Sequence, residues 1–470
     1  MEKTIEPILK RNLLLYLLIS ALGFSFLVLP QQAGVSVPIF VLMQAGFLSH
    51  LMPQKRPLIV LAPIFILALN AFLSANPMWR VANLLVSVLL YGLMAVWMTD
   101  GVFLKDISSA LFRRIGKTIC RAFSRFPVPF RWMSESRKES MPTLRRVFIG
   151  LAISVPVLLF LIVMLSRADL IFSRATLRFF ESLFAFISLS ALARFLFGIV
   201  AGLYLFGILY GVLAVQDEEE EECERTQRRG DCMILNIVLS SVLLVYTLFV
   251  IIQFRYLFAS PDSLPHGLNF ESYARRGFFE LLFLTGVNIA FILLTVWLTK
   301  TQSGRGAKLT KILCLYLCAV TVVLLISSFY RMWLHGSDDG LTTMRLLVFG
   351  FLIFECIGLL ITFFYIWKPN FNIIQVYCLI ALSYYLLLNL APLDRIIARD
   401  QVNRYFETGQ AGIDYTLTLS PDAAPEIARL FQSENSGTRN RARAYFDAIE
   451  SSESWRQWNL SLDRALRLRG

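Results

Sequence analysis

Apolar residues come in long runs along this chain, and short polar segments separate the runs. An α-helix needs ~20 residues to cross a hydrocarbon core of ~30 Å. Eleven runs reach 17 residues or more, and we predict a membrane-spanning helix for each. The runs are Leu13–Leu29, Val35–Leu51, Leu58–Ala75, Val81–Met98, Val147–Leu165, Leu192–Val215, Met233–Phe254, Phe278–Leu298, Ile312–Leu334, Leu346–Trp367 and Phe371–Leu390. The pattern therefore predicts an all-α, polytopic helical membrane protein.

The polar segments divide the chain into four predicted parts. Residues 1–98 hold the first four spans, residues 99–146 form a basic loop, and residues 147–391 hold about seven further spans. After Pro392 the apolar runs end, and we predict a small helical domain over residues 392–470. Ser420–Asp422 (Ser-Pro-Asp) is typical of an N-cap followed by Pro at the first helical position.

The distribution of Lys and Arg predicts the orientation of the spans. Residues 99–146 carry eleven basic residues against four acidic ones, and short loops rich in Lys and Arg stay in the cytoplasm. The N-terminus is then cytoplasmic, and the odd number of spans places residues 392–470 outside the cytoplasmic membrane. Trp79 falls at an outer end, as an interfacial anchor should. Arg167 and its neighbours in an outer loop are an imperfect fit.

The basic loop contains an amphipathic pattern. Its apolar positions recur at helical spacing, and basic residues surround them: Ile107, Leu111, Phe112, Ile115, Ile119 and Phe123, with Arg113, Arg114, Lys117, Arg121 and Arg125. The pattern favours a helix lying in the inner headgroup layer against anionic lipid. The alternative is a cytoplasmic helix packed against the spans.

Composition supports the membrane assignment and changes how the charge is interpreted. The 470 residues are 56% hydrophobic and only 17% charged, with a formal net charge of +12. A positive charge is also a feature of nucleic-acid-binding proteins, but in a membrane protein Lys and Arg gather where loops face anionic lipid. We therefore predict no nucleic-acid partner. The acidic loop at 217–224 is a solvated loop or a docking site for a protein partner, and residues 392–470 are a second candidate partner surface.

No catalytic or metal-binding motif accompanies the spans. The seven Cys lack zinc-site spacing, the three His form no HExxH, and there is no P-loop, GxSxG or dinucleotide fingerprint. The sequence therefore predicts neither a metal nor a cofactor, and it favours a protein that is not an enzyme.

Four charged residues open one of the most apolar spans. Glu271 with Arg275, and Arg276 with Glu280, are i,i+4 pairs. The simple interpretation is that they snorkel and pair locally at a helix end. Glu355, however, lies well inside its span, where an unpaired carboxylate costs about 3 kcal/mol. It should be protonated, paired with Arg, or exposed to a water-filled cavity.

Other charged residues fall at similar depth, so we predict one outward-facing polar cavity. Its candidate lining is Arg276, Glu280, Arg331 and Glu355. Further candidates on the outer face are Glu271 and Arg275, together with Asp338, Asp339 and Arg345 from a loop predicted over residues 335–345. The alternative is a set of separate ion pairs that orient the helices.

Five blocks of the chain form a recognisable set: Tyr256–Leu282 with its Y-A-R-R-G-F-F-E-L core, Met164–Arg174, Tyr330–Arg345 with its G-L-T-x-x-R end, Ala398–Ile427 and Trp455–Leu466. These blocks resemble bacterial membrane proteins grouped as domain of unknown function 4173, with its relative 4153. The resemblance runs from about Val147 to the end of the chain. His335 and Asp339 stand where Tyr is usual, and Arg167 is an extra residue. The resemblance supports the topology and implies no activity.

Two classes of function fit these features. One is a non-enzymatic envelope, signalling or scaffold component with an outward-facing polar site, which the lack of catalytic motifs and the outer domain favour. The alternative is a transporter or lipid-handling protein that uses an intramembrane cavity near Glu355 and Arg331. Against transport, no inverted repeat and no matching pair of broken helices is present.

Overall fold

The computed structural model describes residues 6–29, 34–52, 55–100, 109–135, 154, 164, 189–214, 231–257, 278–299, 304–409, 412–452 and 454–469. Within these ranges the regular structure is helical and contains no strand, which confirms the predicted all-α class. Nine described helices are long and apolar enough to cross a membrane: Pro7–Val28, Arg56–Leu73, Pro77–Met98, Ala191–Leu213, Cys232–Ile252, Glu280–Thr299, Arg305–Tyr330, Thr343–Trp367 and Ile373–Leu390.

Two of the eleven predicted spans do not correspond to any of these nine helices. The predicted span Val35–Leu51 is a shorter apolar helix, α2 (Ser36–Leu51). The predicted span Val147–Leu165 lies outside the described helices. The remaining nine predictions coincide with the nine helices, because long apolar runs leave the backbone no other way to satisfy its hydrogen bonds in hydrocarbon.

The first bundle contains α1 (Pro7–Gly23), α2, α3 (Leu61–Leu73), α4 (Arg80–Asp100) and α9 (Leu189–Ala214). Its fully buried core includes Leu13, Leu48 and Phe206. A buried hydrogen bond of 2.6 Å joins the hydroxyls of Tyr16 on α1 and Tyr91 on α4. Leu and aromatic packing therefore holds this bundle together, and the buried hydroxyl pair links α1 to α4.

The second bundle contains α10 (Cys232–Leu257), α12 (Phe278–Thr299), α13 (Arg305–Asp339) and α14 (Thr343–Trp367). Its core includes Leu239, Ile292, Leu317 and Leu324. Asn288 on α12 accepts a hydrogen bond from the Tyr246 hydroxyl (2.7 Å) and donates one to Thr321 Oγ1 (3.1 Å), joining three helices. Polar side chains of this kind connect helices where lipid offers no hydrophobic driving force.

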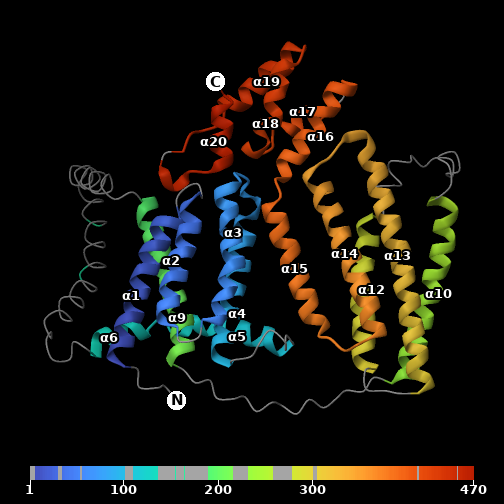
Figure 1. The fold of residues 1–470 in the computed structure, drawn as a ribbon, viewed down its shortest axis with the longest axis horizontal. Coiled ribbons are helices and arrows are strands. Elements are labelled where there is room, and N and C mark those ends of the chain that lie inside the picture. Colours follow the sequence, from blue (N-terminus) through green and yellow to red (C-terminus); the bar gives the residue numbers. More distant parts are fainter. Residues whose placement is uncertain are drawn as a thin grey trace.

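Helix α15 (Ile373–Leu390) links the two bundles. Near its start, the Tyr377 hydroxyl donates to Gly358 O on α14 (2.7 Å). Near its end, the Tyr385 hydroxyl donates to Asn83 Oδ1 on α4 (2.7 Å), and Asn389 O accepts from Asn70 Nδ2 on α3 (2.7 Å). The helix thus crosses obliquely from the second bundle to the first (Figure 1).

The amphipathic helix of the basic loop is α5 (Ser109–Ser124), which lies across the ends of α4 and α9. Ile115 and Ala122 are buried there, and Arg125 Nη1 donates to Gly207 O on α9 (3.1 Å). The helix is thus packed against the ends of two spans, and its predicted position in the inner headgroup layer stays a prediction. Phe112 and Phe123 remain exposed, and their contact with lipid stays a prediction.

The chain after α15 forms a C-terminal unit of helices α16 (Leu393–Thr408), α17 (Ile413–Thr416), α18 (Ala424–Ile427), α19 (Ser436–Asp447) and α20 (Leu460–Arg467). The unit has its own core, which includes Ile397, Val402 and Phe446. Ser420 is an N-cap, as predicted, but the turn that follows is a short 3₁₀ helix, Pro421–Ala423.

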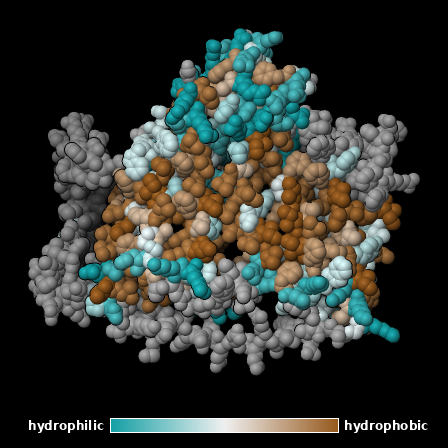
Figure 2. Space-filling model, viewed as in Figure 1, coloured by the Kyte–Doolittle hydropathy of each residue, from teal (hydrophilic) through white to brown (hydrophobic). Residues whose placement is uncertain are grey.

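The C-terminal unit lies at the end of the bundles opposite to the chain's N-terminal end and α5 (Figure 1). In Figure 2 its surface is mostly hydrophilic, whereas the helices below it form a broad hydrophobic band. The exposed side chains of that band, such as Leu244 and Phe283, are apolar. This distribution is that of an integral membrane protein with a water-exposed unit at one end.

Candidate functional site

The C-terminal unit is fastened to the first bundle by two buried or partly buried carboxylates. Asp422 Oδ1 accepts from the backbone N–H of Ala75 (2.8 Å), and Asp422 Oδ2 accepts from the Ser74 hydroxyl. Asp394 Oδ2 accepts from Asn76 Nδ2 (3.0 Å) and from the Ser420 hydroxyl (2.5 Å). The turn between α3 and α4 is therefore held by charge-assisted hydrogen bonds, which are about twice as strong as neutral ones.

The segment before α20 adds a second attachment to the first bundle. Asn459 Nδ2 donates to Ala71 O (2.9 Å) and Ser74 O (2.7 Å), and Trp458 O accepts from Val35 N (2.9 Å). The Arg456 guanidinium stands 4.4 Å from the centroid of the Phe26 ring, a cation–π distance. Residues far apart in the chain thus meet at the ends of α1, α2 and α3.

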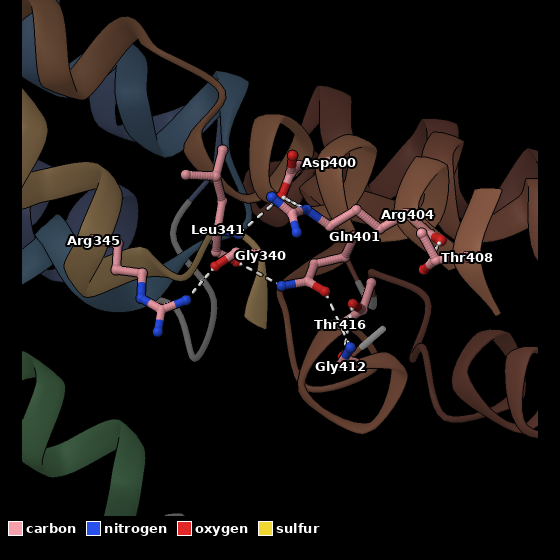
Figure 3. A network of polar contacts seen from close by, with 9 residues as sticks. All are labelled: Gly340, Leu341, Arg345, Asp400, Gln401, Arg404, Thr408, Gly412 and Thr416. Atoms are coloured by element: carbon pink, nitrogen blue, oxygen red, sulfur yellow. Dashed lines mark hydrogen bonds and ion pairs between the residues drawn. The ribbon is translucent and has the colours of Figure 1, made fainter. Parts of the chain in front are cut away.

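The unit is also fastened to the second bundle, at the connection between α13 and α14 (Figure 3). Asp400 Oδ2 accepts from Leu341 N (2.8 Å), and Gln401 Nε2 donates to Leu341 O (2.9 Å). Gln401 Oε1 in turn accepts from Gly412 N (3.1 Å). The backbone N–H and C=O of Leu341 are therefore both hydrogen-bonded to adjacent side chains of α16.

The local sequence explains why this connection has its shape. Gly340 has φ +77°, and a Cβ there would lie 2.6 Å from Gln401 Nε2, so both backbone and space require glycine. Thr342 is the N-cap of α14 and accepts from Arg345 N. Arg345 Nη1 donates back to Gly340 O (2.5 Å), and Thr343 N donates to the Tyr415 hydroxyl (2.8 Å). We call the contacts of the C-terminal unit with the first bundle, together with its contacts at the connection between α13 and α14, the joint.

The four residues predicted to line one cavity are described only in part. Glu355 is buried on α14, 4% exposed, and its Oε2 lies 2.7 Å from Thr285 Oγ1 on α12. Glu280 lies in the first turn of α12 with an exposed side chain. Arg276 and the side chain of Arg331 lie outside the described residues, so the shared cavity stays a prediction. Thr285 is the partner of Glu355 that sequence reasoning missed.

The outer-face candidates separate into three groups. Arg345 is buried in the joint, so it is a structural residue there. Asp338 and Asp339 belong to the last turn of α13, which corrects the predicted loop over 335–345, since the helix continues until Gly340 changes the backbone direction. Their side chains, together with Glu271 and Arg275, lie outside the described residues.

A partly open cavity of about 510 Å³ lies within the joint, between the C-terminal unit and the start of α4. From the first bundle it is lined by Ala75, Pro77 and Arg80, and from the unit by residues that include Tyr445 and Glu450. Neither Glu280 nor Glu355 lines it. Sequence reasoning did not select Arg80, although a lone Arg directly after Trp79 at an outer helix end was visible.

Sequence reasoning also missed the residues that make the joint, namely Asp394, Asp400, Gln401 and Asp422. The signal that could have found them is the resemblance itself. Its blocks at Tyr330–Arg345, Ala398–Ile427 and Trp455–Leu466 supply most of the joint. Blocks far apart in sequence that resemble one family are candidates for contact in space.

The comparison with protein families confirms the broader family assignment. Residues 61–430 match the family described as Domain of unknown function (DUF4153), and the chain belongs to this family. The matched range begins at α3 and ends within the C-terminal unit, so it contains most of the joint. No curated protein and no solved structure matches the chain.

Proposed function

We propose that this protein is a non-enzymatic component of the cell envelope, a scaffold or signalling protein whose C-terminal unit faces the outside of the cytoplasmic membrane. One observation carries the proposal: the unit is fastened to both bundles by the joint. Such an attachment holds two bundles in one arrangement and presents a hydrophilic surface above them. The more specific resemblance to domain of unknown function 4173 stays a prediction.

The orientation rests on the placement of charge. The N-terminal end of α1 and the basic helix α5 share one end of the bundles (Figure 1), and that end is cytoplasmic if Lys and Arg follow the positive-inside rule. The basic loop would then contact anionic lipid, and the acidic loop at 217–224 would face cytoplasmic partners. A single cysteine at Ala444, exposed on α19, should react with an impermeant thiol reagent in intact cells that lack the other cysteines.

A complementation experiment tests the scaffold role. In cells lacking the gene, we compare a joint variant (Asp422→Ala with Gln401→Ala) with Glu355→Gln, at matched amounts of protein in the membrane. The scaffold role predicts that the joint variant fails to restore detergent resistance, whereas Glu355→Gln restores it. The reverse result contradicts the scaffold role.

The alternative, a transporter or lipid-handling protein, is favoured by one observation. Glu355 is a carboxyl group buried inside the second bundle and hydrogen-bonded to Thr285, and ionisable residues in membrane interiors are often functional. Loss of complementation by Glu355→Gln alone would support this alternative. A matched Thr285→Val variant should then show the same loss, because it removes the only described partner of the carboxyl.

A further inference from the structure

The cavity lies at one end of a candidate membrane span. Arg80 is the first residue of α4 and the fourth of the candidate span Pro77–Met98, so we expect it at a boundary of the hydrocarbon layer, where headgroups lie. Trp79 precedes it, and Trp concentrates at that boundary. The cavity volume of about 510 Å³ falls in the range of small-molecule sites, ~300–1,000 Å³.

Arg80 is the one basic residue in the lining of this cavity. Within the described part of the chain, its guanidinium has no hydrogen bond or ion pair. Arg345 and Arg456 at the same end both donate to backbone carbonyls. The guanidinium fork matches a phosphate group, and the N-terminal end of α4 adds partial positive charge. The position therefore favours an anionic group.

Glu450 supplies the one negative charge in the same lining. The other lining residues are uncharged: Ala75, Pro77, Leu417, Pro421, Tyr445, Ala448, Ile449, Gln457, Asn459 and Leu462. The Asn459 amide does not donate to a ligand here, because its Nδ2 already donates to two carbonyls of the first bundle. A ligand that complements the charges of Arg80 and Glu450 is a small molecule or headgroup with one anionic and one cationic group.

An apolar stripe continues below Arg80 along α4. Val81, Leu84, Leu85 and Leu89 are between 52% and 71% exposed, and Leu84 follows Arg80 by one helical turn, on the same face. Acyl chains attached to a headgroup at Arg80 would lie along this stripe. The stripe favours a membrane lipid over a free water-soluble molecule of the same charge.

We propose that the cavity binds the headgroup of a zwitterionic phospholipid, with its phosphate at Arg80 and its ammonium group at Glu450. The bound headgroup would lie between the first bundle and the C-terminal unit, which together line the cavity. This inference stands independently of the scaffold role, because it concerns a ligand and uses none of the joint's own hydrogen bonds.

The test is a titration of the purified full-length chain with short-chain phosphatidylethanolamine, followed by native mass spectrometry. We expect saturable binding of one lipid per chain, weakened at least tenfold by Arg80→Gln. Glu450→Gln should weaken phosphatidylethanolamine but leave short-chain phosphatidic acid, which has no ammonium group, unchanged. Equal affinity of Arg80→Gln and the wild type would overturn the proposal, as would a Glu450→Gln effect on both lipids alike.

Two matched controls separate the site from general effects. Ala448→Phe fills the cavity and should abolish binding, whereas Ala444→Phe, one turn earlier on α19 and outside the lining, should not. Arg399→Gln makes the same charge change as Arg80→Gln at an exposed position outside the cavity. Equal losses in the controls would overturn the site. Equal binding of water-soluble glycerophosphoethanolamine would overturn the assignment to a lipid.

Discussion

At the scale of single residues, the hydrogen bonds around Glu355 bear directly on the protonation state of its carboxyl group. Thr285 Oγ1 has one hydrogen, yet it lies 2.7 Å from Leu282 O and 2.7 Å from Glu355 Oε2. If that hydrogen is donated to Leu282 O, the contact with Glu355 requires a proton on the carboxyl. A neutral carboxyl also avoids the cost of about 3 kcal/mol for an unpaired charge in hydrocarbon.

We therefore expect the Glu355 carboxyl to be protonated at neutral pH. Infrared difference spectra between the wild type and Glu355→Gln should contain the carbonyl stretch of a protonated carboxyl group. Thr285→Val should shift this band because the hydrogen bond is lost. Glu280→Gln, at an exposed position, should leave it unchanged. Detection of a carboxylate band for Glu355 instead would contradict this expectation and would mean that the Thr285 hydroxyl donates to the carboxylate.

Tyr445 is the residue of the C-terminal unit whose titration should affect stability. Burial raises the pKa of its hydroxyl above the ordinary value, and the nearby charges of Asp394 and Asp422 raise the pKa further. The hydroxyl donates to Ser420 O (2.9 Å). Because the unfolded chain loses this proton first, the stability contribution is intact below pH ~10 and declines as pH rises above it.

The pH dependence of Tyr445 can be isolated by substitution. In a thermal unfolding series from neutral pH upward, the midpoint of the wild type should fall more steeply above pH ~10 than that of Tyr445→Phe. At neutral pH the variant should be slightly less stable, by about 1 kcal/mol, for one lost hydrogen bond. Parallel curves for the two proteins would show that folding does not raise the pKa of the Tyr445 hydroxyl.

At the scale of elements, the connection between α13 and α14 is the most constrained part of the joint. Gly340 has a positive φ, which residues with a side chain rarely adopt, and a Cβ at this position would collide with the side chain of Gln401. Gly340→Ala should therefore destabilise the attachment by roughly 1–3 kcal/mol. Hydrogen exchange of the amide of Leu341, which donates to Asp400, should accelerate measurably.

A control glycine makes this prediction specific. A Cβ at Gly46 on α2 would have no neighbouring atom within 4 Å, so Gly46→Ala should leave the exchange at Leu341 unchanged. Equal exchange rates in Gly340→Ala and the wild type would mean that the connection tolerates a side chain, and that Gln401 does not pack against it.

The spans could be predicted from the sequence, because apolar length alone decides which segments cross hydrocarbon. The end of α13 could not, since the helix continues through Asp338 and Asp339 until Gly340. The oblique course of α15 was also inaccessible, because its polar contacts at Tyr377 and Tyr385 involve partners on two different bundles. Contacts between residues far apart in the sequence depend on the tertiary structure, and the hydrophobic periodicity of the sequence does not predict them.

The candidate site was predicted less well than the spans. Arg345 was selected as a polar outer residue, but its side chain is buried at the start of α14 and donates to Gly340 O. Asp422 was visible only as part of an N-cap, and its contact with Ser74 and Ala75 joins positions more than three hundred residues apart. A single sequence shows which residues are polar in an apolar chain, but not which of them meet.

At the scale of the whole molecule, the C-terminal unit bridges two bundles that α15 also links. The unit contacts the first bundle at the turn after α3 and the second at the start of α14. The proposed scaffold role depends on this bridge. It predicts that separate sites on the unit lie close to separate bundles in the same molecule.

Paired cysteines in a chain lacking its seven native Cys test the bridge in a single experiment. One pair is Ser74→Cys with Asp422→Cys, and the other is Thr343→Cys with Tyr415→Cys, each with a protease site introduced at residues 410–411. After treatment with a short bifunctional thiol reagent and cleavage, both pairs should keep the two fragments linked, and single-cysteine variants should release them. Linkage through only one pair, or through neither, would contradict the bridge.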